Sequence, residues 1–426
     1  MKQTIRVATA PIQARVMIPG SKSITNRALL LAALAEGVSE LAGVLACEDT
    51  RVFANALHQL GVVVQWDEAN QTCLIGGTGG QFPRKMASIW CGDAGTAGRF
   101  LLAACACSGG DYYFDGTVQL RNRPIQMLLQ LLCQKGAQVS PTNAIGMPFS
   151  LKGTDELQGG DILVDSSQTG QFVSALLMIA PLAKTAFTIE AENLVSSPYV
   201  NMTCTMMAEF GVLVRKLHSS RFTIPVPQRY QARNYYIEPD FSTASYFFAA
   251  AAITGGQVTM QPIHPMDRNS SKQADIKFLS VLEKMGCEVM SNALGLSVKG
   301  AAELQGVSVD MRDFSDTFMT LAALAPFAKT PVTITNIAHT RHKESDRIAA
   351  MVDGLGNLKI KVEEGPDWIR IYPGQPIATT INSHHDHRIA MAFSIIGLRT
   401  PGIVIEGAEC VAKTCPEFFT LWNSLY

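Results

Sequence analysis

The stretch that decides the fold is Pro19-Gly20-Ser21-Lys22-Ser23-Ile24-Thr25-Asn26-Arg27, which runs directly into the apolar segment 28–35. The Pro-Gly pair predicts a turn, and either serine can cap a following helix by accepting a hydrogen bond from a free backbone N–H. Lys22 and Arg27 stand near the positive end of the helix dipole, which disfavours cations by about 0.3–1 kcal/mol unless an anion compensates. The stretch is therefore either a solvated basic face or an anion site of backbone N–H groups, hydroxyls and two cations.

The same pattern, a polar cap followed by a helix of small apolar residues, recurs along the chain. The six copies begin near Ser21, Asp93, Ser166, Asp240, Asp313 and Asp386. By subtraction, the spacings are 72, 73, 74, 73 and 73 residues. A helix that is apolar on nearly every face must be buried on every face. We therefore expect these helices to form the interior of the protein.

Each buried helix is followed by a strand, a more amphipathic helix and one or two further strands. The amphipathic helices are expected to end at glycines: Gly61, Gly136, Gly211, Gly286 and Gly356. The repeat is thus strand-helix-strand-helix-strand, and its length is half a domain rather than one turn of a solenoid. The pattern predicts an α/β fold of two domains with three repeats each, helices inside and sheets outside: a two-domain inside-out α/β barrel, or prism.

The repeats also predict where the chain passes between the domains. One domain is expected over residues 21–239, and the other over residues 1–20 and 240–426. A strand at residues 3–9 comes before the first repeat, while nothing follows the last helix. We expect this N-terminal strand to complete the C-terminal domain, which is then discontinuous.

Composition excludes several classes of function. The 426 residues are 47% apolar and 17% charged, with a net charge of -1, so a sustained basic field for nucleic acid or anionic membranes is missing. The longest apolar runs, such as 244–254, are far shorter than the roughly 20 residues of a membrane span. The first residues are typical of a strand, not of a signal peptide. Ten cysteines without a Cys-x-x-Cys pair indicate free thiols in a reducing cytosol.

Polar residues gather at the helix starts and in the loops before the amphipathic helices. The cations there are Lys22, Arg27, Arg99, Arg123, Arg347, Arg388 and Lys413. The hydrogen-bonding groups are Ser23, Thr96, Ser166, Ser167, Thr169, Gln171, Ser196 and Ser197. If several helix N-termini converge on one cleft between the domains, their potential would concentrate a small polyanion there. Planar arginine side chains suit carboxylates and phosphates.

Two carboxylates are candidates for proton transfer. Glu344 and Arg347 lie one turn apart at a predicted helix start, where burial beside an anionic substrate could raise the pKa of Glu344 into the range of a general acid. Asp316 belongs to a polar segment before a buried helix. For both residues, capping of the helix is the favoured interpretation of these residues alone.

Three other motifs match no known nucleotide-binding or metal-binding pattern. Gly20-Ser21-Lys22-Ser23 lacks the upstream glycine of a phosphate-binding loop, and the glycines at 76–80 do not match the dinucleotide fingerprint. The cluster His384-His385-Asp386-His387-Arg388 has neither Glu-x-x-His nor paired cysteines around it. Capping and anion contact therefore explain this cluster better than a metal site does.

Six motifs, taken in order, carry a resemblance to a known family. They are 19–27, Asp93-Ala94-Gly95-Thr96-Ala97, Arg123-Pro124-Ile125, Lys343-Glu344-Ser345-Asp346-Arg347, Asp386-His387-Arg388-Ile389-Ala390-Met391 and Ala412-Lys413-Thr414. Together they resemble the 5-enolpyruvylshikimate-3-phosphate synthase family over essentially the whole chain. The resemblance implies transfer of the enolpyruvyl group of phosphoenolpyruvate to the 5-hydroxyl of shikimate 3-phosphate, with release of phosphate, in the pathway to chorismate and the aromatic amino acids. It also implies a cytoplasmic monomer without cofactor or metal.

The resemblance further implies which residues act. Shikimate 3-phosphate would contact Lys22, Ser23, Arg27, Thr169, Gln171, Ser196, Tyr199, Asp316, His339 and Lys343. Phosphoenolpyruvate would contact Lys22, Gly95, Arg123, Gln171, Arg347, Arg388 and Lys413. Asp316 would take the proton of the 5-hydroxyl, and Glu344, with Lys22, would protonate the methylene carbon.

The chain departs from the family pattern in three places. Thr169-Gly170 stands where the family usually has Ser-Ser, Gly98 and Phe100 stand where it has Met and Pro, and His339 stands where Asn is common. Gly95 is kept, so the resemblance implies inhibition by glyphosate.

Two rival functions remain to be compared. The sister transferase that acts on UDP-N-acetylglucosamine uses a loop cysteine and a Lys-Asn pair, whereas here Lys22 is followed by Ser23 and residues 112–123 hold no cysteine. A non-catalytic polyanion-binding protein on the same scaffold would not need both Asp316 and Glu344.

Overall fold

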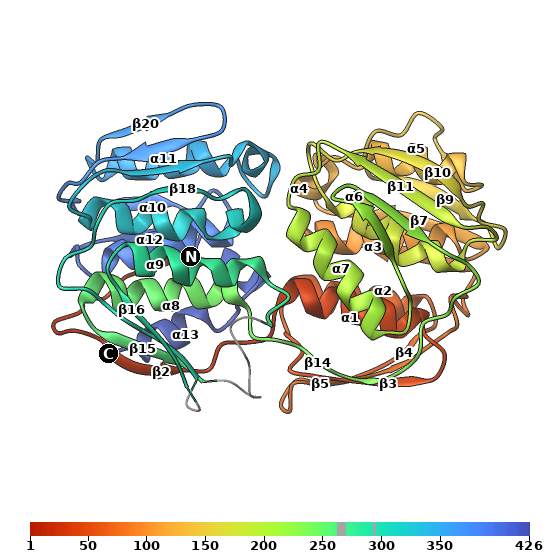
Figure 1. Cartoon of the computed structure of the whole chain (residues 1–426), viewed down its shortest axis with the longest axis horizontal. Coiled ribbons are helices and arrows are strands. Elements are labelled where there is room, and N and C mark those ends of the chain that lie inside the picture. Colours follow the sequence, from red (N-terminus) through yellow and green to blue (C-terminus); the bar gives the residue numbers. More distant parts are fainter. Residues whose placement is uncertain (262–269, 293–294) are drawn as a thin grey trace. The chain divides into compact units, whose positions relative to one another are not determined.

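A computed structural model describes residues 1–261, 270–292 and 295–426 of the chain. It divides into two compact units (Figure 1), which we name after one residue of each. The Lys22 unit is Gly20–Glu238, and the Arg347 unit is Met1–Pro19 with Pro239–Tyr426. Backbone hydrogen bonds join the two chain segments at each boundary, from the Ser21 N–H to the Glu238 carbonyl and from the Asp240 N–H to the Pro19 carbonyl.

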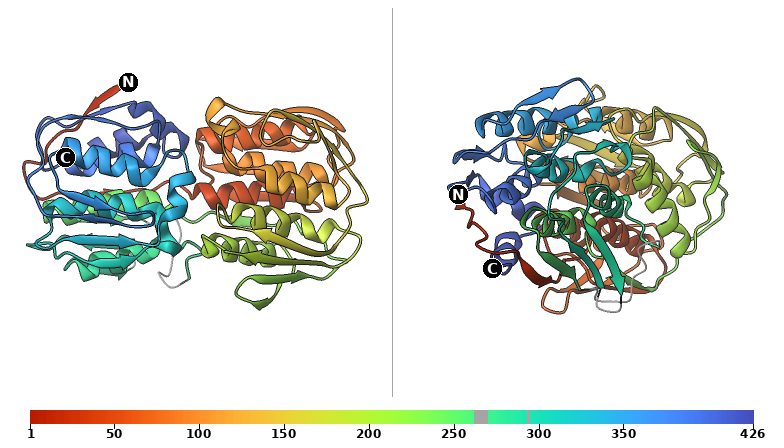
Figure 2. Two further views of the ribbon diagram at one scale, coloured as in Figure 1. Left: turned by 90° about the horizontal axis from the view of Figure 1, so that it is seen from above. Right: turned by 60° about the vertical axis from the view of Figure 1, so that its left-hand side comes forward.

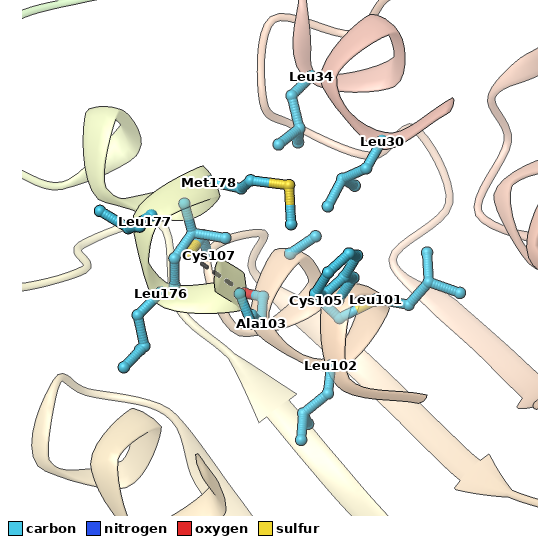
Figure 3. Close-up of a cluster of buried hydrophobic side chains, with 14 of the residues drawn as sticks. Leu30, Leu34, Leu101, Leu102, Ala103, Cys105, Cys107, Leu176, Leu177 and Met178 are labelled. Carbon is cyan, nitrogen blue, oxygen red and sulfur yellow. Dashed lines mark hydrogen bonds between the residues drawn. The ribbon is translucent and has the colours of Figure 1, made fainter. Parts of the chain in front are cut away.

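Three buried helices fill the Lys22 unit. They are α1 (Lys22–Leu34), α3 (Gly95–Ala106) and α6 (Gln171–Ile179). Nearly every side chain on them is buried, as their apolar composition predicts. Figure 3 shows Leu30 and Leu34 of α1 lying beside Met178 of α6, with the α3 side chains next to them. The small residues of these helices let their backbones pack closely in one core.

Three sheets surround that core among the described residues, each with one parallel pair of strands followed by antiparallel neighbours. In the second and third sheets the buried helix α3 or α6 joins the parallel pair. The first is β14 (Asn234–Tyr236), β3 (Val38–Ala42), β5 (Thr72–Gly76) and β4 (Val63–Asp67). The second is β6 (Met86–Trp90), β7 (Gly110–Asp115), β9 (Phe149–Gly153) and β8 (Gln138–Ser140). The third is β10 (Gly160–Asp165), β11 (Phe187–Glu192), β13 (Arg221–Ile224) and β12 (Arg215–His218).

The second helix of each repeat is amphipathic. In the Lys22 unit these helices are α2 (Glu48–Gln59), α5 (Gln126–Gln134) and α7 (Ser197–Glu209), with a short α4 (Val118–Arg121) and the 3-10 turn η1 (Ala180–Leu182). Gly61, Gly136 and Gly211 follow the ends of α2, α5 and α7 with positive φ values, which confirms the predicted helix stops.

The Arg347 unit repeats the design with its own buried helices. They are α8 (Phe241–Thr254), α10 (Phe318–Leu324) and α12 (His387–Gly397). The other helices are α9 (Phe278–Lys284), α11 (Arg347–Asn357) and α13 (Phe418–Asn423). Short 3-10 segments are η2 (Ala274–Lys277), η3 (Arg312–Thr317), η4 (Ala325–Phe327), η5 (Ala338–His342) and η6 (Ala408–Lys413).

The sheets of the Arg347 unit include two strands from the start of the chain. One sheet is β16 (Glu288–Asn292), β17 (Gly295–Lys299), β15 (Gln257–Met260) and β2 (Gln13–Val16). Another is β18 (Ser308–Asp310), β19 (Val332–Thr335), β21 (Ile369–Ile371) and β20 (Val362–Glu364). The third is β1 (Lys2–Thr4), β23 (Val404–Glu406) and β22 (Thr380–Asn382). The strand expected at residues 3–9 is therefore the shorter β1, and β2 follows it.

The chain order of β2 and β14 explains the discontinuity. β2 precedes α1 along the chain but pairs with β15 of the Arg347 unit, while β14 precedes α8 but pairs with β3 of the Lys22 unit. Each pairing is parallel, so each strand begins a repeat whose helix lies elsewhere in the sequence. Figure 2 shows the two groups of helices with sheets on their outer sides. The predicted inside-out α/β fold with six repeats is confirmed.

One predicted helix stop is wrong. Gly286 follows α9 with a positive φ, as expected, but Gly356 lies inside α11, which continues to Asn357. The left-handed residue after α11 is Lys359, with φ 63°. The part of the chain that the structure describes contains no helix long and apolar enough to cross a membrane.

Candidate active site

The start of α1 holds its cation against a carboxylate. Ser21 is the N-cap residue, but its side chain makes no capping hydrogen bond, so the predicted serine cap is wrong at this position. Lys22 Nζ donates to Asp49 Oδ2 at 2.8 Å, and Asp49 lies in the first turn of α2. This ion pair offsets the unfavourable position of Lys22 at a helix N-terminus. Asp49 is not among the predicted site residues, although the adjacent acids Glu48 and Asp49 indicate a helix start.

Arg27 is the second cation of α1 and is buried. Its guanidinium donates to Thr203 Oγ1 at 2.8 Å, to the Ser23 carbonyl at 3.0 Å and to the Tyr199 carbonyl at 3.2 Å. Burial lowers the pKa of Arg27 to about 10, so the side chain still carries its charge at neutral pH. Within the described residues its hydrogen bonds all go to uncharged oxygens. Arg27 is thus held by uncharged partners, in contrast to a buried arginine that contacts carboxylates.

Arg99 organises the starts of α3 and α6. Its guanidinium donates to the Pro124 carbonyl at 2.7 Å and to Gln171 Oε1 at 2.7 Å. Gln171 in turn donates to Thr96 Oγ1 at 3.3 Å. These contacts join three segments in which the sequence analysis predicted binding residues. Arg99 is one of the cations that the sequence places in this region, although the family resemblance assigns it no substrate contact.

Gly95, the first residue of α3, keeps two arginines close to the helix start. A Cβ atom at Gly95 would lie 2.7 Å from Arg123 Nη1 and 2.7 Å from Arg99 Nη1. Any larger side chain must therefore displace a guanidinium. The predicted residues Gly95, Arg123 and Gln171 are brought into one region by Arg99.

The structure explains two of the departures from the family pattern. A Cβ at Gly170 would lie 2.8 Å from the Val195 carbonyl oxygen, so a serine does not fit there without a shift of the backbone. The Arg27 guanidinium lies 5.2 Å from the centre of the Phe100 ring, a cation–π contact that proline could not make.

The remaining predicted residues of the Lys22 unit lie at the starts of α6 and α7. Thr169 Oγ1 accepts a hydrogen bond from the Gln171 N–H at 3.2 Å. Ser196 precedes α7 with φ 56°, a left-handed conformation that is uncommon for serine. Tyr199, in the first turn of α7, contacts Arg27 through its carbonyl.

Arg347 is the centre of the second group of predicted residues. It begins α11, is 2% exposed and contacts three carboxylates. The distances are 2.8 Å to Asp386 Oδ2, 3.0 Å to Asp316 Oδ1 and 2.8 Å to Glu344 Oε2. These carboxylates raise the pKa of Arg347 above its usual value, although burial alone would lower it. Asp346, not Glu344, caps α11 by accepting from the Ala349 N–H at 3.0 Å, so the capping interpretation of Glu344 is wrong.

Asp316 and Glu344 each contact at least two cations. Asp316 Oδ2 lies 2.8 Å from Arg388 Nη2, in addition to its contact with Arg347. Glu344 Oε1 lies 3.6 Å from Lys413 Nζ. Burial alone would raise the pKa of Asp316, but the surrounding cations, Arg388 first, hold it well below its usual range. Asp316 is therefore an ion-pair partner rather than the helix cap that was the other interpretation.

Two further buried groups lie near Asp316. His339 shares a hydrogen bond with Ser315 Oγ at 2.7 Å, and burial lowers the pKa of His339 to about 3. A neutral imidazole at this position can make hydrogen bonds as the asparagine common in the family would. Asp275 accepts from Ser242 Oγ at 3.0 Å, and burial, then the charge of Asp316, raises the pKa of Asp275 to about 7. Asp275 is not among the predicted residues, because nothing in its local sequence pattern distinguishes it from a surface acid.

The predicted residues thus form two groups, one in each unit. Lys22, Arg27, Gly95, Arg123 and Gln171 belong to the Lys22 unit. Asp316, Glu344, Arg347, Arg388 and Lys413 belong to the Arg347 unit. In the described residues, no group of three or more His, Cys, Asp or Glu side chains is arranged to hold a metal ion.

The fold is that of the enolpyruvyl transferases. The enolpyruvyl transferase NikO from Streptomyces tendae is similar over 100% of this chain and 97% of its own, with a TM-score of 0.78 and 17% identity, which shows the fold alone. An EPSP synthase from Acinetobacter baumannii gives a TM-score of 0.83 with 27% identity, covering 99% of this chain and 97% of that one.

Sequence comparison narrows the class to one family. The family model for EPSP synthase (3-phosphoshikimate 1-carboxyvinyltransferase) matches residues 7–422. A 3-phosphoshikimate 1-carboxyvinyltransferase from a Nostoc species is 47% identical over 96% of both chains. One from Syntrophobacter fumaroxidans is 42% identical over 100% of both. The chain belongs to the EPSP synthase family, as the motifs of the sequence implied.

Proposed function

We propose that this protein transfers the enolpyruvyl group of phosphoenolpyruvate to the 5-hydroxyl of shikimate 3-phosphate and releases phosphate. The observation that carries the proposal is the family match over nearly the whole chain, with both candidate carboxylates kept and in contact with Arg347. The product belongs to the shikimate pathway, which leads to chorismate and the aromatic amino acids.

Shikimate 3-phosphate is an anion, and the Lys22 unit offers it several donors. Arg27 supports this assignment best, because its buried charge has hydrogen bonds only to uncharged oxygens among the described residues. We assign the remaining contacts of this substrate to Lys22, Ser23, Thr169, Gln171, Ser196, Tyr199, Asp316, His339 and Lys343. His339 fits a neutral hydrogen-bonding role, since its pKa is lowered to about 3 by burial.

Phosphoenolpyruvate carries a phosphate and a carboxylate, which planar guanidinium groups can bind through two hydrogen bonds each. We assign its contacts to Lys22, Gly95, Arg123, Gln171, Arg347, Arg388 and Lys413. Arg99 supports the contacts from the Lys22 unit indirectly. Its guanidinium holds Gln171 and the Pro124 carbonyl, which is next to Arg123.

The reaction needs a base and an acid. Asp316 takes the proton of the 5-hydroxyl while the oxygen of that group bonds to the central carbon of phosphoenolpyruvate. Glu344, with Lys22, delivers a proton to the methylene carbon, which becomes a methyl group. The product regains its methylene, so one proton of that methyl group must leave again as the C–O bond to phosphate breaks. Two carboxylates in different environments suit these separate duties.

The direct test is to mix the protein with both substrates and measure released phosphate. We expect phosphate and the enolpyruvyl ether of shikimate 3-phosphate in equal amounts, and no phosphate when shikimate 3-phosphate is left out. Phosphate release without the second substrate would indicate a phosphatase. No release with both substrates present would reject the proposal. Replacing shikimate 3-phosphate by UDP-N-acetylglucosamine tests the sister activity, for which we expect no product.

We further propose that the enzyme acts as a monomer in the cytoplasm and needs no cofactor. Its ten cysteines are all free thiols, which suits a reducing compartment. Light scattering on the purified protein should give the mass of one chain, and dialysis against a chelator should leave turnover unchanged. A dimer mass, or loss of turnover that added metal restores, would contradict this part.

A further inference from the structure

The cations assigned to phosphoenolpyruvate in the Arg347 unit are in contact with the protein's own carboxylates. Asp316 uses one oxygen on Arg347 Nη1 at 3.0 Å and the other on Arg388 Nη2 at 2.8 Å. It therefore bridges two guanidinium groups, as the two oxygens of a bound carboxylate or phosphate would. Arg388 is about 10% exposed in this arrangement, so little of its surface is open to a ligand.

Glu344 does the same on the other side of Arg347. Its oxygens lie 2.8 Å from Arg347 Nη2 and 3.6 Å from Lys413 Nζ. All three cations of this group thus contact at least one of the two carboxylates to which we assign proton transfer, and Asp386 on Arg347 supplies the third negative charge. A buried cation of this kind would otherwise have a large cost of desolvation.

Asp316 cannot act as an efficient base while it bridges the arginines. Although burial opposes the effect, Arg388 and Arg347 hold the pKa of Asp316 well below its usual range. A general base works best when its pKa is near the operating pH. The contacts that fill the cation sites therefore also keep the base inactive.

Arg347 also pairs with Asp386, and this ion pair does not depend on the contact between Asp316 and Arg388. Asp386 lies 2.8 Å from Arg347 Nε, is fully buried, and also caps α12 by accepting from the Arg388 N–H at 2.9 Å. Arg347 would keep this partner if Asp316 moved away. The Asp316–Arg388 contact is consequently the one that can exchange without breaking the whole network.

We propose that the unliganded Arg347 unit is self-occupied: Asp316 takes the place of a substrate anion on Arg388 and Arg347, and an arriving anion exchanges with it. The exchange replaces one carboxylate by another anion, so the cations keep their charge balance. It also frees Asp316 to accept the proton of a hydroxyl. Binding of phosphoenolpyruvate and activation of the base are then one event. This inference rests on the proposed function, because it takes Asp316 as the base.

Binding of inorganic phosphate, measured by calorimetry without any turnover, tests the exchange. In Asp316→Asn the competing charge is gone, so phosphate should bind about 10-fold more tightly than to the wild type. Asp313→Asn is the control, because Asp313 belongs to the same segment η3 but forms an exposed pair with Lys277 at 3.1 Å. It should leave phosphate affinity unchanged. Equal or weaker binding by Asp316→Asn would overturn the inference.

The Arg388→Gln background shows whether the gain occurs at the proposed place. If Asp316 competes for Arg388, the gain in phosphate affinity from Asp316→Asn should largely vanish when Arg388 is already Gln. A gain of the same size in both backgrounds would mean a general effect of charge and would overturn the exchange.

The exchange can also be tested on the wild-type protein, so that the result does not depend on whether a variant folds. With aspartate labelled by carbon-13, phosphate should shift a carboxylate stretch in the infrared difference spectrum, since one aspartate loses two guanidinium partners. No shift at saturating phosphate would overturn the inference. Turnover with both substrates is measured separately: its absence rejects the proposed function, whereas turnover without the spectral shift rejects only the exchange.

Discussion

Arg27 and Arg347 are both buried arginines, yet their surroundings are opposite. Arg27 donates to uncharged oxygens, and burial lowers its pKa to about 10. Arg347 contacts Asp316, Glu344 and Asp386, and these charges raise its pKa above the usual value. A buried charge without a counter-ion is costly, so it favours binding of an anion from outside. A buried charge with three counter-ions instead holds those carboxylates in place. This contrast predicts that Arg27 chiefly binds an anion, whereas Arg347 in addition holds the reacting carboxylates in place.

The largest expected effect comes from Glu344→Gln, which keeps the shape of the side chain and removes the acid. Loss of a general acid typically costs a factor of about 10²–10⁴ in rate. We expect turnover to fall by at least about 10³-fold, while shikimate 3-phosphate still binds, because Arg27 and its unit are unchanged. Steady-state kinetics and calorimetry measure the two effects.

Glu363→Gln is the matched control, since Glu363 pairs with Lys361 on the surface at 3.2 Å. This variant should leave turnover and the binding of shikimate 3-phosphate unchanged. Unchanged turnover in Glu344→Gln would favour a non-catalytic polyanion-binding protein on this scaffold and would remove the division of labour between the units.

Replacing each arginine by methionine compares the two surroundings directly. Arg347→Met leaves three carboxylates without their shared cation, and breaking a buried pair costs about 3–5 kcal/mol. Arg27→Met loses hydrogen bonds but also a desolvated charge, so we expect a cost below about 2 kcal/mol. Urea unfolding without ligands measures both.

Ligand binding should separate the same two variants in the opposite sense. Shikimate 3-phosphate should protect the folded Arg347→Met protein against urea and should fail to protect Arg27→Met. Equal destabilisation of the two variants, or equal protection, would mean that the contrast between the arginines has no energetic consequence.

Gly95→Ala tests how closely the arginines of the Lys22 unit approach the start of α3. The new Cβ would lie 2.7 Å from Arg123 Nη1, so this guanidinium must move. We expect the KM for phosphoenolpyruvate to rise about 10–100-fold, which is roughly 1.4–2.7 kcal/mol of binding. Glyphosate should inhibit the wild type in competition with phosphoenolpyruvate, and the variant should be inhibited less.

Gly356→Ala is the control, because a Cβ there meets no heavy atom within 4 Å. It should leave the KM unchanged. The absence of competition by millimolar glyphosate in the wild type would contradict the sensitivity that Gly95 implies.

The repeats and their buried helices could be predicted because they depend on local patterns. The helices α1, α3 and α8 are apolar on nearly every face, so they must be buried whatever their neighbours are. The family resemblance supplied the site residues, but not their partners. Arg347 contacts carboxylates 31, 3 and 39 residues away, and no local pattern selects them. The same holds for the pairing of Lys22 with Asp49.

Among the local predictions that were wrong, two have a clear physical reason. Gly356 was expected to stop a helix, but α11 continues through it and Lys359 adopts the left-handed conformation instead. Glycine permits such a conformation without requiring it. Glu344 had helix capping as an alternative, yet Asp346 accepts the capping bond. Adjacent acids compete for one cap, and only their geometry decides between them.

The smallest expected effect concerns the acid response of the Arg347 unit. Burial lowers the pKa of His339 to about 3 from an ordinary value of 6.5. Between these values the unfolded chain binds a proton that the folded protein does not, so stability falls as the pH falls. From pH 7 to pH 5 this histidine should remove about 2 kcal/mol of stability.

His339→Asn, which can keep a hydrogen bond to Ser315, should therefore lose about 2 kcal/mol less than the wild type over this range. His342→Asn, at an exposed neighbour, should behave as the wild type does. Urea unfolding at the two pH values decides the point: an equal loss in all three proteins would mean that burial does not hold His339 neutral.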